Sequence, residues 1–488
     1  CYNWPRSDTM RLSPLMLPAG LLLLVLLAAA AIFAMDAGRS VIFPYPLDYG
    51  EGPLLEQTVR LAHLEGIYRP DLTSPPYTVS NYPPVYPLVL APLARASGPA
   101  FWYGRLLSVL SMIAAATLIG LILRSLTGDT LASAIGGLLL FSFAPAAYWA
   151  LLYRVDALAL ALSLAGLYVC ARYPRGRGTV TIAALLLTAA IYTRQSYGVA
   201  APLAACVWLA RSAGWRRALS LAGSIVGLGM VVFVVLDLAS GGGFRFDIVT
   251  ANLNTYDPGS LLWYLSDVWM LMPLALIGAG VYAVSAGWSA VPSWGLIAPY
   301  LVGAWLAALT IGKAGSNVNY LLEAGAAVSL SLGALLAWQR PRWIAQAAIA
   351  LLLALDVSLM VLASPYRPVI QARLAEREPA QRLLGIMHDA RGVVLADEDI
   401  GLLPLDGRPI YFQPFEMTQL ARAGRWDQRP FLDSLERQAF AAILLYRIPQ
   451  VPLHRTRWTD EMLATIERRY VMEQRIGATE VYRPRRGD

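Results

Sequence analysis

The sequence almost lacks lysine. Among its 488 residues, lysine and arginine together number 39, and Lys313 is the only lysine. This residue lies in the polar stretch GKAGSNVNYLLEAG, which separates two apolar runs. A GC-rich coding bias explains arginine in place of lysine elsewhere. The remaining lysine is then either a chance survivor or a position where a compact ammonium group is required.

Charged residues are also scarce, at 15% of the chain, where soluble proteins carry roughly a quarter. The 24 residues from Leu12 to Met35 contain no charge, which is long enough to cross a bilayer as a helix. They are too long for the apolar part of a signal peptide, so we expect an uncleaved first helix. The fold class predicted is a polytopic α-helical membrane protein with about eleven transmembrane helices. The predicted apolar segments are 12–35, 101–123, 130–151, 155–171, 179–196, 197–210, 218–238, 261–286, 291–311, 318–338 and 343–363.

Cysteine and histidine are rare, with three of each. Their positions show no metal-ligand spacing and no disulfide framework. We therefore expect no metal site and no cofactor, with a divalent metal ion left open. The net charge of +7 does not indicate a nucleic-acid partner, because most arginines lie in short loops or in the tail rather than on an aromatic-rich basic surface.

Arginine is distributed unevenly among the breaks between apolar segments. One set of alternate breaks holds eleven positive charges, beginning with Arg6 and Arg11, and the other set of short breaks holds four. The positive-inside rule then places the N-terminus in the cytoplasm. The membrane that we expect the chain to cross is the inner (plasma) membrane. The predicted transmembrane domain is 1–363, including a first extracytoplasmic loop at 36–100, and residues 364–488 are predicted to lie outside.

The tail 364–488 differs in composition from the rest of the chain. GVVLAD, RPIYF, AAILLYR and YVMEQRIG are typical of strands, whereas RPFLDSLERQ and TDEMLATIERRY are typical of helices. Thr459 suits an N-cap of the second helix. We predict a small extracytoplasmic α/β domain, without catalytic motifs, because no Gly-rich phosphate loop and no nucleophile elbow is present.

Polar residues gather at the predicted outer ends of the helices. Charges at a membrane edge are costly and usually mark a working site, although outer loops that are simply hydrated offer another explanation. Asp356 is an exception, since it lies deep within the last apolar segment and no pattern accounts for it. The gathered residues are Arg154, Asp156, Arg194, Gln195, Asp237, Arg245, Asp247, Asp267, Lys313, Asn317, Asn319 and Glu323.

The first outer loop opens with two carboxylates, Asp48 and Glu51, followed by an amphipathic pattern that predicts a helix on the membrane surface. A carboxylate held among tyrosines at the membrane edge is partly desolvated, which raises its basicity and suits a general base. The spacing of three residues equally fits a capping box. The residue chemistry leaves both interpretations open.

The same loop ends in SPPYTVSNYPPVYPLVLAPL. Five prolines between Pro75 and Pro87 argue against a regular helix. Tyr77, Tyr82 and Tyr86 suit a headgroup boundary, either as an aromatic ledge beside a bound lipid headgroup or as an interfacial anchor.

Taken together, these features resemble the GT-C superfamily of polyprenyl-phosphate-sugar-dependent glycosyltransferases. The acidic DYGEG after the first helix, the NYPPVYPL stretch and the late GKAGSNVNYLLE loop carry the resemblance, which extends in layout over nearly the whole chain. Within the superfamily, the chain looks most like the branch with bacterial protein mannosyltransferases and the lipid A aminoarabinose transferase.

The resemblance implies an inverting transfer from a lipid phosphate on the outer face to an acceptor in the cell envelope. The acceptor would be a glycan, lipid or protein. The general base would be Asp48, which matches the family position, with Glu51 in doubt because it departs from the usual adjacent pair. A cation must receive the charge that develops on the departing phosphate. Lys313 is our first candidate, with backbone N–H groups near Gly312 and Gly315 approaching the same oxygens.

Arg194 is a second candidate for the phosphate. Residues expected to bind donor or acceptor are Tyr82, Asp156, Gln195, Asn317, Asn319, Tyr320 and Glu323. Glu323 is also close enough in sequence to form a structural ion pair with Lys313.

Two other classes of function fit the sequence less well. A transporter or lipid flippase would place charge at the membrane midplane and often shows repeated halves, and this chain shows neither. A membrane-anchored sensor would not explain the acidic first loop or the single lysine.

Overall fold

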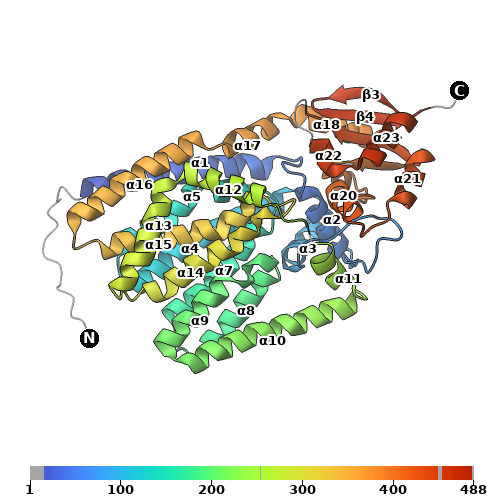
Figure 1. Cartoon of the computed structure of the whole chain (residues 1–488). Coiled ribbons are helices and arrows are strands. Elements are labelled where there is room, and N and C mark those ends of the chain that lie inside the picture. The colour runs from blue at the N-terminus through green and yellow to red at the C-terminus, as the bar shows by residue number, and fades with distance from the viewer. Residues whose placement is uncertain (1–15, 253, 449–452, 486–488) are drawn as a thin grey trace.

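The computed structural model describes residues 16–252, 254–448 and 453–485. Arg6, Arg11 and the first four residues of the predicted segment 12–35 lie outside these ranges. The molecule is a long bundle of helices with a small α/β domain at one end (Figure 1). Helix α1 runs from the opposite end toward that domain (Figure 1).

Each predicted apolar segment is helical over most of the length that the structure describes. The bundle helices are α1 Met16–Ile42, α4 Trp102–Thr127, α5 Thr130–Ser142, α6 Ala144–Trp149, α7 Asp156–Arg172, α8 Thr179–Ile191, α9 Ala200–Ala213, α10 Trp215–Ala239, α12 Pro258–Leu271, α13 Pro273–Trp288, α14 Trp294–Ala308, α15 Leu322–Trp338 and α16 Trp343–Ala363. By length and composition, 6 helices in the described ranges can cross a membrane, or up to 7 if the bent pair α12–α13 counts as one span. The chain is thus polytopic, and eleven crossings remain a prediction.

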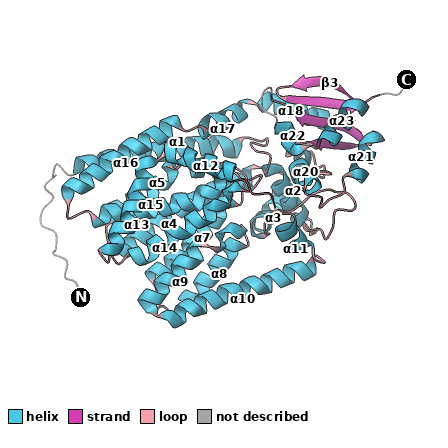
Figure 2. Ribbon diagram, viewed as in Figure 1, coloured by secondary structure: helices cyan, strands magenta, loops and turns pink. Residues whose placement is uncertain are grey.

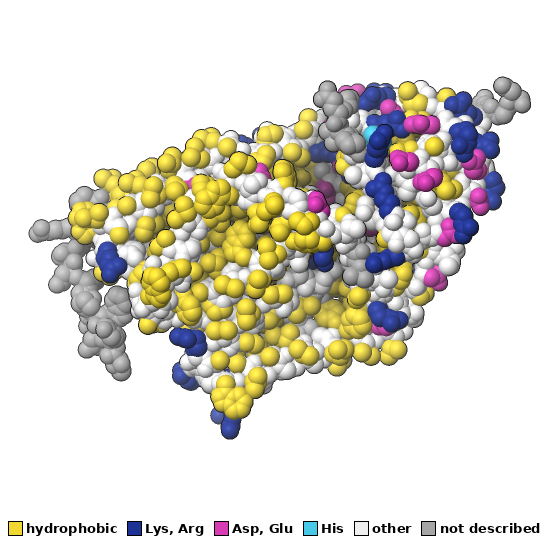
Figure 3. Space-filling view, in the orientation of Figure 1, with side chains coloured by type: hydrophobic (Ala, Val, Ile, Leu, Met, Phe, Trp, Pro, Cys, Tyr) yellow, Lys and Arg dark blue, Asp and Glu magenta, His cyan; other side chains and the backbone are white. Residues whose placement is uncertain are grey.

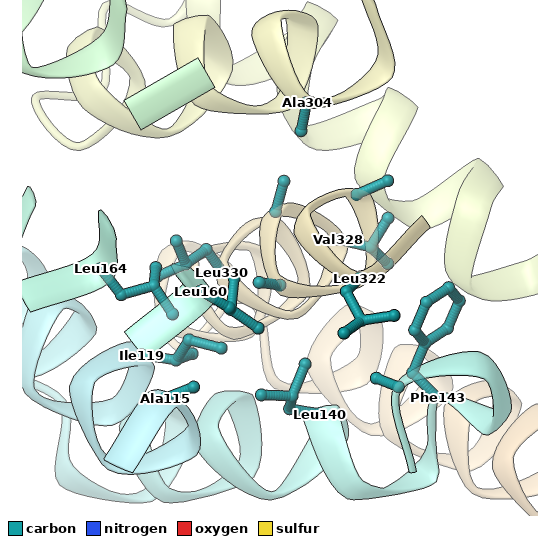
Figure 4. Close-up of a cluster of buried hydrophobic side chains, with 14 of the residues drawn as sticks. Ala115, Ile119, Leu140, Phe143, Leu160, Leu164, Ala304, Leu322, Val328 and Leu330 are labelled. Carbon is teal, nitrogen blue, oxygen red and sulfur yellow. The ribbon is translucent and has the colours of Figure 1, made fainter. Parts of the chain in front are cut away.

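The core of the bundle surrounds α15. Of its most apolar window, 89% is buried, against 11% for α10 on the outside. Leu322 and Leu330 of α15 belong to the same cluster of buried hydrophobic side chains as Leu160 of α7 and Leu140 of α5 (Figure 4). Hydrophobic side chains also cover most of the visible outer face of the bundle, whereas charged side chains gather on the α/β domain (Figure 3). This distribution suits a bundle whose outer face contacts lipid.

Two of the predicted segments are broken. The third divides into α5 and α6 beside Pro145, and the eighth divides into α12 and α13, which meet at an angle of 95°. Asp356 of α16 explains how the second break is tolerated. Its carboxylate accepts hydrogen bonds from the backbone N–H groups of Ala275 (2.8 Å) and Leu274 (3.4 Å) in the first turn of α13. A buried acidic group thus caps a helix that starts inside the bundle.

Replacing Asp356 with leucine should therefore destabilise the protein. The substitution leaves two N–H groups at a buried helix start without an acceptor, at a cost of about 1–3 kcal/mol each. We expect a lower midpoint of thermal unfolding in detergent. Asp356→Asn should lose less, because its amide oxygen still accepts a hydrogen bond. Equal midpoints for the leucine variant and the wild type would show that Asp356 has no capping role.

The first loop contains two helices. α2 (Glu51–Ala62) confirms the predicted helix, but nine of its twelve residues are buried, so it lies within the protein rather than on a surface. α3 (Val85–Ser97) was not predicted, because the prolines from Pro75 to Pro87 argued against helix. That interpretation was wrong for the end of the stretch: Pro84 precedes the helix and Pro87 lies in its first turn, where the missing N–H has no partner to lose.

The C-terminal domain consists of a four-stranded sheet and short helices. The strands are β1 Val393–Ala396, β2 Phe440–Tyr446, β3 Tyr470–Ile476 and β4 Thr479–Pro484, in the order β1-β2-β4-β3, with β1 and β2 parallel and the other pairs antiparallel. The sheet belongs to this domain (Figure 2). The helices are α17 Tyr366–Ala375, α18 Arg377–Asp389, α19 Leu402–Leu405, α20 Pro414–Arg422, α21 Arg429–Glu436, α22 Leu453–Arg457 and α23 Asp460–Arg469.

Three predicted strands and both predicted helices of this domain are confirmed, and the Thr459 hydroxyl accepts from the Met462 N–H as an N-cap. RPIYF is not a strand of the sheet. Its backbone bonds instead to the first loop, where the Tyr77 N–H donates to the Tyr411 carbonyl (2.7 Å) and the Gln413 N–H to the Tyr77 carbonyl (2.9 Å). The fourth strand of the sheet is β4, which was not predicted from the sequence.

The C-terminal domain and the first loop share one hydrophobic core. Leu72 and Tyr77 of the loop pack with Phe412 and Trp426 of the domain, and the Trp426 indole donates to the Leu72 carbonyl (3.0 Å). Both regions therefore lie at the same end of the bundle, as the predicted topology requires.

Candidate active site

A buried ion pair fixes the chain where α1 leads into the first loop. Glu51, at the first position of α2, and Arg105 of α4 are both fully buried. Their side chains form two parallel hydrogen bonds of 2.9 and 2.7 Å. Glu51 also accepts from the N–H groups of Leu47 (2.6 Å) and Tyr153 (2.7 Å). Arg105 donates further to the carbonyls of Ser40, Phe43 and Tyr45.

Loss of this pair should cost stability. Glu51→Gln leaves the Arg105 guanidinium buried without a counter-charge, which costs about 3–5 kcal/mol. We expect a clear fall in the thermal unfolding midpoint and in the yield of folded protein. Glu65→Gln, in the same loop, is the matched control because its side chain is 63% exposed. If the two variants unfold at the same temperature, the pair does not anchor the loop.

Asp48 lies on the turn just before this anchor. Its Oδ1 accepts from the Gly50 N–H (3.0 Å) and from Arg154 Nη1 (3.3 Å), whereas Oδ2 accepts no hydrogen bond within the described ranges. The side chain is 23% exposed, so a substrate can reach it. Burial raises the pKa of Asp48 above its ordinary value, and the neighbouring Arg154 guanidinium opposes that rise.

Arg154 connects Asp48 to a second polar group. Its guanidinium lies 4.9 Å from the Trp149 ring centre, and the Trp149 indole donates to Asp156 (2.6 Å). Asp156 begins α7 and forms a buried ion pair with Arg194. Asn319 donates to Asp156 (3.1 Å) and accepts from Arg194 through its carbonyl (3.2 Å). The Arg194 guanidinium also lies 4.4 Å from the Tyr320 ring centre. Four of the predicted site residues therefore form one network: Asp156, Arg194, Asn319 and Tyr320.

Lys313 lies on a short loop between α14 and α15, and its side chain is exposed. The backbone of this loop pairs with residues 254–257: Tyr256 and Lys313 form an antiparallel bridge, and the Ala314 N–H donates to the Thr255 carbonyl (2.8 Å). The Tyr320 hydroxyl is within electrostatic range of both Arg194 and Lys313. No side chain in the described part of the chain forms an ion pair with Lys313.

The two glycines beside Lys313 allow aromatic rings to pack against the loop. A Cβ at Gly312 would lie 2.7 Å from the Tyr256 ring, and a Cβ at Gly315 would lie 2.5 Å from the Phe415 ring. Gly315 also has φ +82, a conformation that favours glycine. Aromatic rings therefore occupy the space beside both glycines. The approach of backbone N–H groups at these glycines to a phosphate stays a prediction.

Glu323 does not pair with Lys313. It is buried in the first turn of α15, close to Arg194 and Tyr300, and its Oε1 has no hydrogen-bond partner among the described residues. The structural ion pair that the sequence spacing allowed is absent from the described ranges.

The C-terminal domain reaches into the site through the start of α20. Glu416 accepts from the Tyr49 hydroxyl (2.9 Å) and from the Asn81 amide (3.2 Å), and burial raises the pKa of Glu416 to about 7. Arg457 lies 4.5 Å from the Tyr49 ring centre. Phe415, the neighbour of Glu416, packs against Gly315. The start of α20 therefore contacts both the turn that contains Asp48 and the loop that contains Lys313.

The remaining predicted residues line the edges of this region. The Tyr82 hydroxyl accepts from Arg154 (3.4 Å), and the Gln195 amide donates to the Asn81 carbonyl (3.1 Å). Asn317 is exposed and its side chain accepts from the adjacent Val318 N–H (2.7 Å). Sequence reasoning missed Arg105 and Glu416. A single arginine within the apolar segment 101–123 was the available signal for Arg105.

No cluster of three or more His, Cys, Asp or Glu side chains that could hold a metal ion occurs among the described residues. The site is built from carboxylates, guanidinium groups, one ammonium group, amides and tyrosines. Such a site can remove a proton through Asp48 and stabilise negative charge at the Lys313 loop.

Comparison with solved structures identifies the fold. The chain is similar to ArnT from Cupriavidus metallidurans bound to undecaprenyl phosphate, with a TM-score of 0.61, 15% identity, and coverage of 93% of this chain and 97% of that chain. The apo state of the same protein matches equally well in TM-score, at 0.61, with 16% identity over 93% of this chain and 97% of that chain.

The apo Archaeoglobus fulgidus oligosaccharyltransferase is more distant, with a TM-score of 0.52, 12% identity, and coverage of 93% of this chain and 72% of that chain. No protein-family model matches the sequence, and the search of curated proteins found no match. The chain has the GT-C fold of these glycosyltransferases, which confirms the resemblance drawn from the sequence at the level of fold.

Proposed function

We propose that this protein is an integral-membrane glycosyltransferase that moves a sugar from a polyprenyl-phosphate donor to an acceptor on the extracytoplasmic face. The observation that carries the proposal is Asp48. It is an accessible, partly desolvated carboxylate with one free oxygen, held where the first helix of a GT-C fold leads into its first loop. The ArnT structure that this chain resembles holds undecaprenyl phosphate, which supports a lipid-phosphate donor.

Asp48 is the general base in this proposal, and Glu51 positions it. All the hydrogen bonds that hold Glu51 are internal, to Arg105 and to two backbone N–H groups. A buried carboxylate so occupied cannot reach an acceptor proton. Asp48 Oδ2 is free to accept one, and partial burial strengthens it as a base.

Lys313 is the proposed cation for the departing phosphate. Arg194 is paired with Asp156 through Nη1 and is only 2% exposed, so a donor phosphate reaches the Lys313 ammonium more readily, although Arg194 Nη2 has no hydrogen-bond partner among the described residues. Lys313 has an exposed ammonium group on a backbone that Tyr256 and Thr255 hold in place. We assign Arg194, Asp156 and Asn319 to positioning Tyr320 and the Lys313 loop.

The proposed reaction is a single displacement with inversion. The acceptor nucleophile attacks the anomeric carbon as its proton passes to Asp48, and the bond from that carbon to the lipid phosphate oxygen breaks. The electron pair of that bond leaves with the phosphate, whose charge Lys313 stabilises. Tyr82, Gln195, Asn317 and Tyr320 surround this region and are proposed to contact the sugar or the acceptor, with Glu323 behind them.

A panel of radiolabelled polyprenyl-phosphate sugars tests the function. Purified protein in detergent with membrane extract as acceptor source should release label from at least one donor and transfer it to an acceptor, with one free polyprenyl phosphate formed per sugar. Transport of an intact lipid-linked sugar across proteoliposomes, without cleavage of the sugar–phosphate bond, would replace the transferase by a flippase.

The proposed topology makes a separate prediction. Fused after Asp488, a reporter that works only outside the cytoplasm should be active. Placed before the first helix, a reporter that works only in the cytoplasm should be active. Cytoplasmic activity of the C-terminal fusion would reverse the orientation and would place the Asp48 site on the wrong side for a lipid-linked donor.

A further inference from the structure

A partly open cleft lies between α1, α6 and the junction of α16 with α17, apart from the candidate active site. Its walls are mostly apolar and include Ala29, Ile32, Phe33, Phe141, Ala147 and Val361. Successive residues of α6 separate it from the candidate active site, since Tyr148 lines the cleft and the Trp149 indole donates to Asp156 on the other side. The mechanism proposed above uses none of the cleft residues.

The cleft contains an incompletely satisfied charged pair. Arg367 Nε donates to Asp36 Oδ2 (2.9 Å), and the Asp36 side chain is only 7% exposed. Asp36 Oδ1 is buried without a hydrogen-bond partner in the described ranges. A buried carboxylate oxygen without a donor is costly, so this position suits a donor group from a ligand. The Arg367 side chain is 38% exposed, and Nε is the donor through which it contacts the protein within those ranges.

Membrane lipid has direct access to this place. Only 22% of the apolar window of α1 and 33% of that of the span Trp343–Ala375 are buried, so both leave an outer face open to a bilayer. Helices α1, α16 and α17 run along one side of the bundle toward the C-terminal domain (Figure 1). Asp36 and Arg367 therefore lie toward the membrane edge, where lipid headgroups are found.

From these observations we infer that the cleft binds one membrane phospholipid whose headgroup carries a primary ammonium, such as phosphatidylethanolamine. The headgroup ammonium donates to Asp36 Oδ1, the phosphate accepts from the free Nη groups of Arg367, and an acyl chain lies along the apolar wall. The zwitterionic headgroup complements the neutral Asp36–Arg367 pair. A phosphatidylglycerol headgroup would bring only negative charge to Asp36, and a choline headgroup has no N–H to donate.

Native mass spectrometry of the delipidated full chain tests this inference. We expect one phosphatidylethanolamine to be retained at least about tenfold more strongly than phosphatidylcholine or phosphatidylglycerol of the same acyl chains. Asp36→Asn should remove that preference, and Arg367→Met should weaken all phospholipids. Arg340→Met is the matched control, because Arg340 forms a similar ion pair with Asp129 at the other end of α16.

A further variant and a lipid competition test the inference in the same measurement. Ala147→Phe places a bulky side chain in the cleft and leaves both charged residues unchanged, so it should also abolish retention while the protein remains folded. Equal retention of the three phospholipids by the wild type would overturn the ammonium assignment. Stoichiometric displacement of phosphatidylethanolamine by undecaprenyl phosphate would instead give the cleft to the donor lipid. Neither result depends on whether the protein transfers sugar.

Discussion

Asp48→Asn should abolish sugar transfer and leave donor binding largely intact. Asparagine fills the same space and retains one oxygen for the Gly50 N–H, but it cannot take the acceptor proton. General-base assistance contributes roughly 10²–10⁴-fold to a rate, so the transfer rate of the variant should be lower than that of the wild type by at least this factor. The measurement is single-turnover transfer with a saturating lipid-linked donor, together with donor binding to the same preparation.

The wild-type pH profile should support this assignment. A base works in its deprotonated form, so the rate should increase as the pH passes upward through the raised pKa of Asp48, and this acidic limb should vanish in the Asn variant. Asp71→Asn is the matched control because Asp71 is an exposed carboxylate of the same loop. If Asp48→Asn transfers sugar normally and Glu416→Gln does not, the base belongs to the C-terminal domain. If both transfer normally, the mechanism is wrong.

Lys313→Met should lower turnover by roughly a hundredfold or more, which is the scale for removing one preorganised group that stabilises developing charge. The loss should fall on kcat more than on KM, because the charge on the phosphate grows as the sugar departs. Lys313→Arg should restore only part of the rate, since a planar guanidinium does not occupy the position of a compact ammonium. Arg245→Met, which removes an exposed cation from another segment of the chain, serves as the control.

The competing explanation for Lys313 was an ion pair with Glu323. The structure places Glu323 in the bundle interior and leaves the Lys313 ammonium exposed, so the double variant Lys313→Met/Glu323→Gln should be no more active than Lys313→Met. Recovery of activity in the double variant would show that the two residues act as a pair and would end the phosphate assignment.

The sequence predicts the layout of this protein well because its signals are local. Apolar runs predict the bundle helices, the amphipathic pattern after Glu51 predicts α2, and Thr459 predicts the start of α23. Local signals fail where a distant segment satisfies the backbone. RPIYF has strand character but bonds to Tyr77, more than three hundred residues earlier in the chain.

Buried charges show the same limit from the other direction. Asp356 appears unexplained in its own segment and is explained only by the broken start of α13. The capping-box spacing of Asp48 and Glu51 did not reveal that Glu51 pairs with Arg105, because that contact joins two helices. Membership of Asp156, Arg194, Asn319 and Tyr320 in one site was predictable, because the alternation of loops places all four at the same end of the bundle.

The anomeric configuration of the product tests the central claim most directly. A donor of known configuration at the sugar–phosphate bond is incubated with the purified protein, and the isolated product is analysed by NMR spectroscopy. A single displacement assisted by Asp48 predicts a product of the opposite configuration in every turnover. Retention of configuration would require a second carboxylate or another group to act as a nucleophile on the sugar, and it would contradict the mechanism proposed for this site.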